Sequence, residues 1–259
     1  MIYKHYTHNY LLAPPHELTV SLIGCGGTGS QVLTAIGRMN YALRQLGHPG
    51  LLVTAYDDDI VTEANCGRQL FSEQDIGHNK AETLVTRLNM FFGTRWDCVQ
   101  GMYKKSSPTT NIIISCVDTV KSRKEIGGNL RQLGMYDSNN VLYWMDFGNT
   151  VNSGQVIIGT AGRTHKQPER KRGCVGFLPS VNEMFELDRL NDKNSGPSCS
   201  LAQALTRQDL FINSTLANLG MTLFWRLFKG VTDTHGVYVN LETMKVNPIK
   251  VAKYDNKRI

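Results

Sequence analysis

Residues 21–32, SLIGCGGTGSQV, form a short apolar run that passes into glycines and then into a helix-like sequence. Gly24, Gly26 and Gly29 have the spacing GxGxxG directly after a predicted strand. Glycines permit a tight turn and a close approach of a ligand to the backbone, and the amides at the start of a helix attract an anion. The stretch therefore predicts an α/β fold with a phosphate-binding loop. It fits a redox dinucleotide as well as ATP, and a turn needed only for packing is the remaining alternative.

Apolar strand-like runs and helical periodicity alternate over the first 160 residues. The predicted strands are 18–23, 51–56, 96–102, 111–116, 141–146 and 154–160, and the predicted helices are 28–46, 78–92 and 119–133. This order predicts a Rossmann-like, doubly wound fold with a mainly parallel sheet, in which ligands bind at the carboxyl ends of the strands.

The second half of the chain has a different composition. Residues 162–198 are dominated by Pro, Gly, Lys and Arg, and we interpret them as a long crossover loop that passes over the site, with a short helix at 181–187. An apolar helix at 208–229 and two strands, at 237–241 and 249–252, form the predicted C-terminal antiparallel extension. The expected organisation is an N-terminal extension (1–18) and one domain (19–259), divided into a nucleotide-binding core (19–160), the crossover loop (161–200) and C-terminal helices and strands (201–259).

Composition excludes several classes of protein. The chain has 259 residues, of which 41% are hydrophobic and 8% aromatic, enough for a packed core. No apolar run approaches the ~20 residues of a membrane span, so we expect a soluble, cytoplasmic protein. Six cysteines without a CxxC pair disfavour a disulfide framework and structural zinc.

The net charge of +6 is concentrated in residues 163–172 and 253–258. These segments are either solvated loops or a surface for an acidic protein partner. They lack the interleaved aromatic residues of a single-strand binding platform, so nucleic acid is an unlikely partner.

A polar segment after the second predicted strand carries the first chemical signal. Asp57 ends that strand, where a carboxylate can accept hydrogen bonds from a ribose. Asn65, Arg68 and Gln69 follow, and Lys80 lies near the start of the next helix, where the helix dipole disfavours a cation. A cation in that position indicates an anionic ligand, with a merely solvated lysine as the alternative. Arg68 could make forked contacts to phosphate oxygens and Lys80 could act as a point charge.

Asp118 supplies the second signal, because it comes just after the β-branched run NIIISC at 111–116. A carboxylate there could hold Mg²⁺ against a triphosphate. Two cations and one metal-competent acid fit phosphate transfer or nucleotidyl transfer better than hydride transfer. The residues therefore favour Mg²⁺-ATP over a redox dinucleotide.

The motifs taken together resemble a known family. GCGGTGS, DDDIVTEANCGRQ, GHNK and SCVDTVKSR are similar to the ThiF/MoeB/HesA group, relatives of the ubiquitin-activating enzymes. The second half, with PSCSLAQALTRQDLFIN and GVYVNLET, resembles the ThiF-type proteins of the plasmid-associated PRTRC systems.

This resemblance implies ATP-dependent adenylation of the C-terminal carboxylate of a small ubiquitin-like protein with a flexible tail, usually by a homodimer. Matched by position, it implies these roles: Gly24, Gly26, Gly27 and Gly29 in the loop; Asp57 at the ribose; Asn65, Arg68 and Lys80 at the phosphates; Asp118 as the Mg²⁺ ligand; and Arg123 as the arginine on the helix after C-x-D. Asp59 and Gln69 of the same motifs are further candidate cofactor-binding residues.

Some relatives transfer the activated carboxyl group to a cysteine, which can pass it to a conjugating protein. Cys199 is our first candidate, because it follows Pro197-Ser198 and precedes a helix-like run, and a helix N-terminus favours a thiolate. Cys174 is the second candidate, and an ordinary buried cysteine is the alternative for both.

Two other functions remain open. A nucleotide-dependent oxidoreductase would bind NAD without Mg²⁺ and would tolerate loss of Arg68. A non-catalytic scaffold would keep the fold and the dimer without turnover, and would have no need for Asp57, Arg68, Lys80 and Asp118 together.

Overall fold

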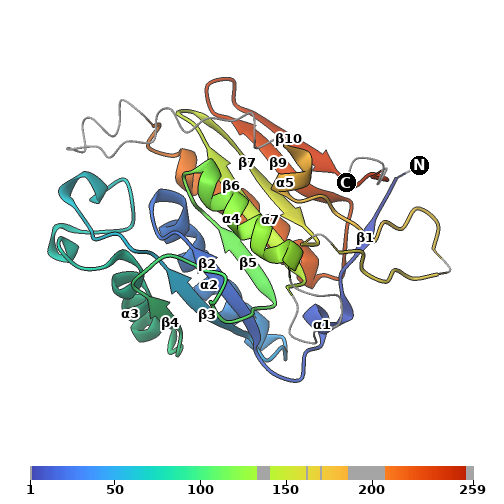
Figure 1. Cartoon of the computed structure of the whole chain (residues 1–259), viewed down its shortest axis with the longest axis horizontal. Coiled ribbons are helices and arrows are strands. Elements are labelled where there is room, and N and C mark those ends of the chain that lie inside the picture. The colour runs from blue at the N-terminus through green and yellow to red at the C-terminus, as the bar shows by residue number, and fades with distance from the viewer. Residues whose placement is uncertain (1, 133–140, 162, 170, 186–207, 255–259) are drawn as a thin grey trace.

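The computed structural model describes residues 2–132, 141–161, 163–169, 171–185 and 208–254. Its main feature is an eight-stranded sheet (Figure 1). In spatial order the strands are β10 (Lys245–Lys250), β9 (Thr234–Asn240), β7 (Ser153–Gly159), β6 (Tyr143–Asn149), β5 (Ile112–Ser115), β2 (Leu18–Ile23), β3 (Leu51–Tyr56) and β4 (Asp97–Val99). The strands from β6 to β4 are parallel, and β7, β9 and β10 continue the sheet in antiparallel pairs. The predicted doubly wound sheet with an antiparallel extension is confirmed.

Helices cover both faces of this sheet. One face carries α2 (Gly27–Gln45), α3 (Lys80–Phe92) and α7 (Ile212–Phe228), which contact one another through α2. The other face carries α4 (Val120–Gln132) and α5 (Val181–Met184), and in Figure 1 α4 crosses in front of the sheet while α7 lies behind it. The remaining helices in the described ranges are short: α1 (Asn9–Leu12) and the 3₁₀ helices η1 (Glu63–Asn65) and η2 (Glu73–Asp75).

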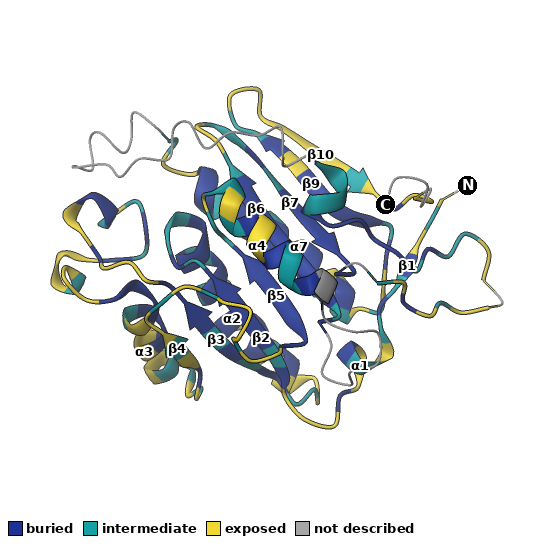
Figure 2. Ribbon diagram, in the orientation of Figure 1, coloured by how far each residue is buried: buried dark blue, intermediate teal, exposed yellow. Residues whose placement is uncertain are grey.

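The core follows from strands that are apolar on both faces. In β5, Ile112 and Ile114 pack into the cluster under α2 and α7, while Ile113 packs into the cluster under α4. All three are at most 1% exposed, and Figure 2 shows this central strand buried between the helix layers. An uninterrupted β-branched run is the expected sequence for such a strand.

The N-terminal segment packs into the domain and does not extend from it. His5 and Leu11 are fully buried, and β1 (His5–Tyr6) pairs with β8 (Val231–Thr232). The segment is too short and polar to show periodicity, so its packing depends on partners remote in sequence.

Other boundaries also differ from expectation, and the helix predicted at 208–229 is α7, Ile212–Phe228. β10 begins at Lys245, earlier than the predicted 249, because it is a mostly exposed edge strand that lacks an apolar pattern. It contains Pro248, which an edge strand tolerates. The strand predicted at 96–102 is limited to β4, Asp97–Val99. Within the described ranges, no helix is both long and apolar enough to span a bilayer.

Candidate functional site

The candidate site lies at the carboxyl ends of the parallel strands. Gly24 follows β2 and its amide donates to Tyr56 O (2.9 Å), while the Cys116 amide, after β5, donates to Ile23 O (2.8 Å). The Asp57 amide, after β3, donates to Val99 O (3.2 Å). The glycine loop, the acidic end of β3 and the segment that precedes Asp118 therefore meet at one edge, as the alternating pattern predicts.

Three of the loop glycines are required for close packing. Gly24 has φ +89°, and a Cβ there would lie 2.8 Å from Cys116 O. A Cβ on Gly27 would lie 2.6 Å from Asn213 Nδ2, and one on Gly29 would overlap the Gly24 carbonyl. These contacts seat the first turn of α2 against β2, β5 and α7.

Gly26 differs from these three glycines. The nearest atom to a Cβ added there is Gln69 Oε1, at 4.0 Å, so the protein leaves space over this residue. Gln69 is 6% exposed, and its Oε1 is buried without a hydrogen-bond partner in the structure. The loop is therefore open at Gly26, beside an unsatisfied buried polar atom.

Asp57 joins the loop to the end of β3. Its Oδ2 accepts from the Cys25 amide (2.5 Å) and its Oδ1 from the Asp59 amide (2.9 Å). Burial raises the pKa of Asp57, and the two amide hydrogen bonds oppose that rise. Each carboxylate oxygen keeps a lone pair, so the group could also accept a hydrogen bond from a ribose hydroxyl.

Lys80 is the first residue of α3 and its side chain is only 8% exposed. Its Nζ lies 2.7 Å from Asp59 Oδ2, on a side chain that is 67% exposed. Asn79 sets this geometry, because it caps α3 by accepting from the Glu82 amide and donates to the carbonyls of Asp57 and Asp59. The sequence predicted an anionic ligand for this helix-start cation, and in the structure its partner is the carboxylate of Asp59.

A group of three carboxylates lies at the same place. Oxygen atoms of Asp57, Asp58 and Asp59 lie within 4.8 Å of one another, close enough for one cation, and Asp58 and Asp59 are exposed. These are hard oxygen ligands of the type that Mg²⁺ prefers.

Arg68 reaches the site from the segment after η1. Its Nη1 donates to Gln208 Oε1 (2.7 Å), while its Nε is buried and has no partner among the residues that the structure describes. Burial lowers the pKa of Arg68. Asn65, by contrast, uses its Oδ1 to accept from the Thr62 amide (2.9 Å) and hydroxyl (3.0 Å), which closes η1. Nε of Arg68 could therefore donate to an anion, whereas the side-chain oxygen of Asn65 already accepts two hydrogen bonds from Thr62.

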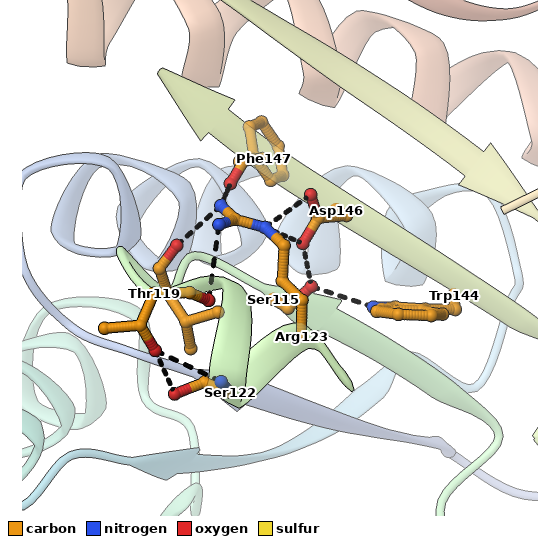
Figure 3. A network of polar contacts seen from close by, with 8 residues as sticks. Ser115, Thr119, Ser122, Arg123, Trp144, Asp146 and Phe147 are labelled. Atoms are coloured by element: carbon orange, nitrogen blue, oxygen red, sulfur yellow. Dashed lines mark hydrogen bonds and ion pairs between the residues drawn. The ribbon is translucent and has the colours of Figure 1, made fainter. Parts of the chain in front are cut away.

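Asp118 is exposed on the loop between β5 and α4, and Arg123 shapes that loop (Figure 3). Arg123 is 8% exposed; its Nε lies 3.1 Å from both oxygens of Asp146. Its Nη2 donates to the carbonyls of Val117 (2.6 Å) and Phe147 (2.8 Å). Arg123 therefore fixes the backbone directly before Asp118 and is not free to bind phosphate.

The one candidate cysteine within the described ranges, Cys174, does not lie at this edge. Cys199 lies outside the described residues. Cys174 is half-buried and forms an isolated β-bridge with Lys4. The carbonyl of the next residue, Val175, contacts the ring of His5. The same ring contacts the hydroxyl of Tyr143, at the start of β6. Cys174 therefore lies at the opposite end of the sheet from the glycine loop.

Two other cysteines, Cys25 and Cys116, flank the loop. Burial raises the pKa of both thiols well above the ordinary value, which disfavours the thiolate form that a nucleophile needs.

Sequence reasoning missed Asn213, which lies in the first turn of α7 and is 3% exposed. Its side chain contacts Thr28, Asn149 and Gln208 by hydrogen bonds of 2.9 to 3.0 Å. The one available signal was a polar residue at the start of an otherwise apolar helix.

These features fit an anionic nucleotide. The loop is open at Gly26, Lys80 is a buried cation, and within the described part of the chain Arg68 Nε and Gln69 Oε1 are buried atoms without partners. The fold and the site define a Rossmann-like α/β protein with an anion-accepting glycine loop. The chain belongs to the ThiF family, whose family model matches residues 16–251.

Several solved structures share the fold. Escherichia coli MccB is 15% identical, with a TM-score of 0.59 over 96% of this chain and 67% of that chain. The structure of E. coli MccB with ATP gives 15% identity and a TM-score of 0.57 over 95% and 66%, and PaaA gives 13% and 0.58 over 92% and 65%. This chain spans 63% to 67% of the length of these proteins. No curated protein sequence matches it.

Proposed function

We propose that the protein adenylates the C-terminal carboxylate of a small ubiquitin-like protein, using ATP and Mg²⁺, and that it acts as a homodimer. One observation carries the proposal in this ThiF-family chain: the buried Lys80 and the half-buried Arg68 are cations at the edge of the sheet where the loop is open at Gly26. A structure of MccB, which shares the fold, is a complex with ATP, and another contains MccA.

The reaction needs charge stabilisation more than proton transfer. A carboxylate oxygen of the partner attacks the α-phosphorus, the bond from that phosphorus to the bridging oxygen breaks, and pyrophosphate leaves. The carboxylate is already a nucleophile at neutral pH, so no side-chain base is required. Arg68 and Lys80 offset the charge on the phosphates, and Asp57 orients the ribose.

Mg²⁺ would be held by Asp118, and Asp57, Asp58 and Asp59 offer a separate group of carboxylate oxygens within reach of one cation. It would neutralise charge on the phosphates as pyrophosphate departs. Because Asp59 pairs with Lys80 at 2.7 Å, the triphosphate must compete with that carboxylate for the lysine.

Transfer to a cysteine is the second step of the proposal. The thiolate of Cys199 would attack the carbonyl of the acyl adenylate, form a thioester and release AMP. A downstream conjugating protein would then accept the acyl group. The similarity of residues 197–213 to the PRTRC proteins directs the search for the ubiquitin-like partner to neighbouring genes.

ATP–pyrophosphate exchange tests the adenylation step. Small proteins encoded nearby and ending in a flexible glycine-type tail should support exchange, and the same proteins without the tail should not. Arg68→Ala, Lys80→Ala and Asp118→Ala should each reduce exchange by roughly 10²–10³-fold, as expected when a charge-stabilising group is lost. Lys245→Ala, on the exposed edge strand β10, is the matched control and should retain full exchange.

The same experiment separates the rival functions. ATP binding without exchange for any partner would favour a non-catalytic scaffold. Tight NAD binding that needs no Mg²⁺ and survives Arg68→Ala would favour an oxidoreductase.

A further inference from the structure

Five polar side chains from separate parts of the sequence form one chain of hydrogen bonds beside the glycine loop. Thr28 Oγ1 donates to Asn213 Oδ1 (2.9 Å), and Asn149 Nδ2 donates to the same oxygen (3.0 Å). Asn213 Nδ2 donates to Gln208 Oε1 (3.0 Å), which also accepts from Arg68 Nη1 (2.7 Å). The first turn of α2, the end of β6 and the start of α7 are thus connected to Arg68 through two amide groups.

The donors around Asn213 and Gln208 fix the orientation of both amides. Asn213 must present its oxygen to Thr28 and Asn149, because both donate to it, and it therefore presents its NH₂ group to Gln208. Gln208 must then present its oxygen to Asn213 and to Arg68 together. A flipped Gln208 amide would place two NH₂ groups face to face and would set a donor against the guanidinium.

The acceptor that holds Arg68 is neutral, which matters for an anionic ligand. Gln208 fixes one arm of the guanidinium without cancelling its charge, whereas Lys80 is paired with the carboxylate of Asp59 at 2.7 Å. Nε of Arg68 stays buried and without a partner. A guanidinium that is oriented, charged and unsatisfied at Nε is preorganised to donate to a phosphate oxygen.

We propose that Gln208 and Asn213 are positioning residues, which hold Arg68 in the orientation that contacts the nucleotide phosphates. The inference rests on the proposed function, since it requires that the protein binds ATP. Asn213 also packs against Gly27, where a Cβ would lie 2.6 Å from its Nδ2. The same amide therefore sets the position of the glycine loop and, through Gln208, that of the arginine.

Isothermal titration calorimetry with a non-hydrolysable ATP analogue tests this without a protein partner. Gln208→Ala should weaken binding by about 5–20-fold, because Arg68 must be ordered when the phosphate binds. Gln208→Glu, almost the same shape, should weaken binding at least as much, because its carboxylate neutralises the guanidinium and repels the phosphates. Both variants should keep the wild-type melting temperature within a few degrees.

A double-mutant cycle shows whether Gln208 acts through Arg68. In an Arg68→Ala background, Gln208→Ala should cause no further loss of affinity, since the group it positions is gone. A merely structural role for Gln208 would produce the same loss in both backgrounds.

Asn213→Asp is the sharpest probe of the second amide. It keeps oxygens for Thr28 and Asn149 but replaces the donor to Gln208 by an acceptor, so affinity for the analogue should fall. Asn218→Asp, the same change at an exposed position of α7, is the matched control.

If the wild-type protein binds the analogue and the Gln208 variants bind it equally well, this inference is wrong and the proposed function stands. If the wild-type protein does not bind the analogue, both are wrong.

Discussion

Arg123 and Asp146 form a buried ion pair, with Arg123 Nε 3.1 Å from both carboxylate oxygens. Asp146 is 1% exposed and also accepts a hydrogen bond from Ser115 Oγ (2.6 Å), which in turn accepts from Trp144 Nε1 (2.8 Å). The guanidinium of Arg123 also donates a hydrogen bond, from Nη2, to the Val117 carbonyl. The pair thus connects β5, β6 and α4 to the loop that carries Asp118, as Figure 3 shows.

Removing one partner of this pair should destabilise the protein. Arg123→Met leaves the Asp146 carboxylate buried without its counter-ion, and the free energy of unfolding should fall by about 3–5 kcal/mol. Urea denaturation measures the change. Lys121→Met, on an exposed part of the same helix, should change it by less than about 0.5 kcal/mol. An Arg123→Met protein as stable as the wild type would show that water or another group compensates the charge.

Two neighbouring glycines should respond differently to the same substitution. Gly29→Ala should fail to fold or lose several kcal/mol, because its Cβ would overlap the Gly24 carbonyl. Gly26→Ala should fold normally, because nothing lies nearer than 4.0 Å, yet should bind ATP at least about 10-fold more weakly, since the methyl group occupies the open space. Melting temperature and ATP titration measure the two effects. Full ATP affinity in Gly26→Ala would place the phosphates elsewhere.

Stability should depend on pH through buried histidines with lowered pKa values, among them His5, His165 and His235. His5 and His165 both contact the Tyr143 hydroxyl (2.9 and 3.2 Å). Burial lowers the pKa of His5 from 6.5 to about 4 and that of His165 to about 3. The unfolded chain therefore binds more protons below pH 6.5, so stability is full above that pH and falls as the pH decreases toward the folded-state values. At about pH 5, each of these two histidines should lower the free energy of unfolding by on the order of 2 kcal/mol.

Urea unfolding at pH 7 and at pH 5 measures this dependence. His165→Phe should remove its share of this dependence, about 2 kcal/mol at pH 5, because that imidazole no longer gains a proton on unfolding. His16→Phe, at an exposed position, should leave it unchanged. An unaltered pH dependence in His165→Phe would show that the buried imidazole is not its source.

The thioester step predicts a difference between two cysteines. With ATP and an adenylated partner, the wild-type protein should form an adduct that thiols cleave, and Cys199→Ser should abolish it. Cys174→Ser is the matched control and should form the adduct normally, because Cys174 lies at the other end of the sheet. Denaturing, non-reducing gels separate the species. An adduct that survives Cys199→Ser would exclude Cys199 as the acceptor.

Local patterns predicted most of the fold, because they report burial directly. The uninterrupted run around Ile113 predicted a strand covered on both faces, and the structure confirms it. The edge strand β10 was predicted too short, since an exposed strand carries no apolar pattern. The buried contacts of His5 and Leu11 were missed, since their partners are far along the chain.

The sequence by itself determined the order of strands and helices, the glycine loop and the side chains that gather at the carboxyl ends of the strands, because spacing and periodicity are local properties. The tertiary structure decided how those side chains are used. It left space over Gly26 but packed Gly27 against Asn213. It also paired Lys80 with Asp59, and it buried Arg123 in an ion pair with Asp146. Asn213 and Thr28, 185 residues apart, meet only because α7 packs on α2. Contacts over such separations depend on how helices pack on the sheet, which no local pattern specifies.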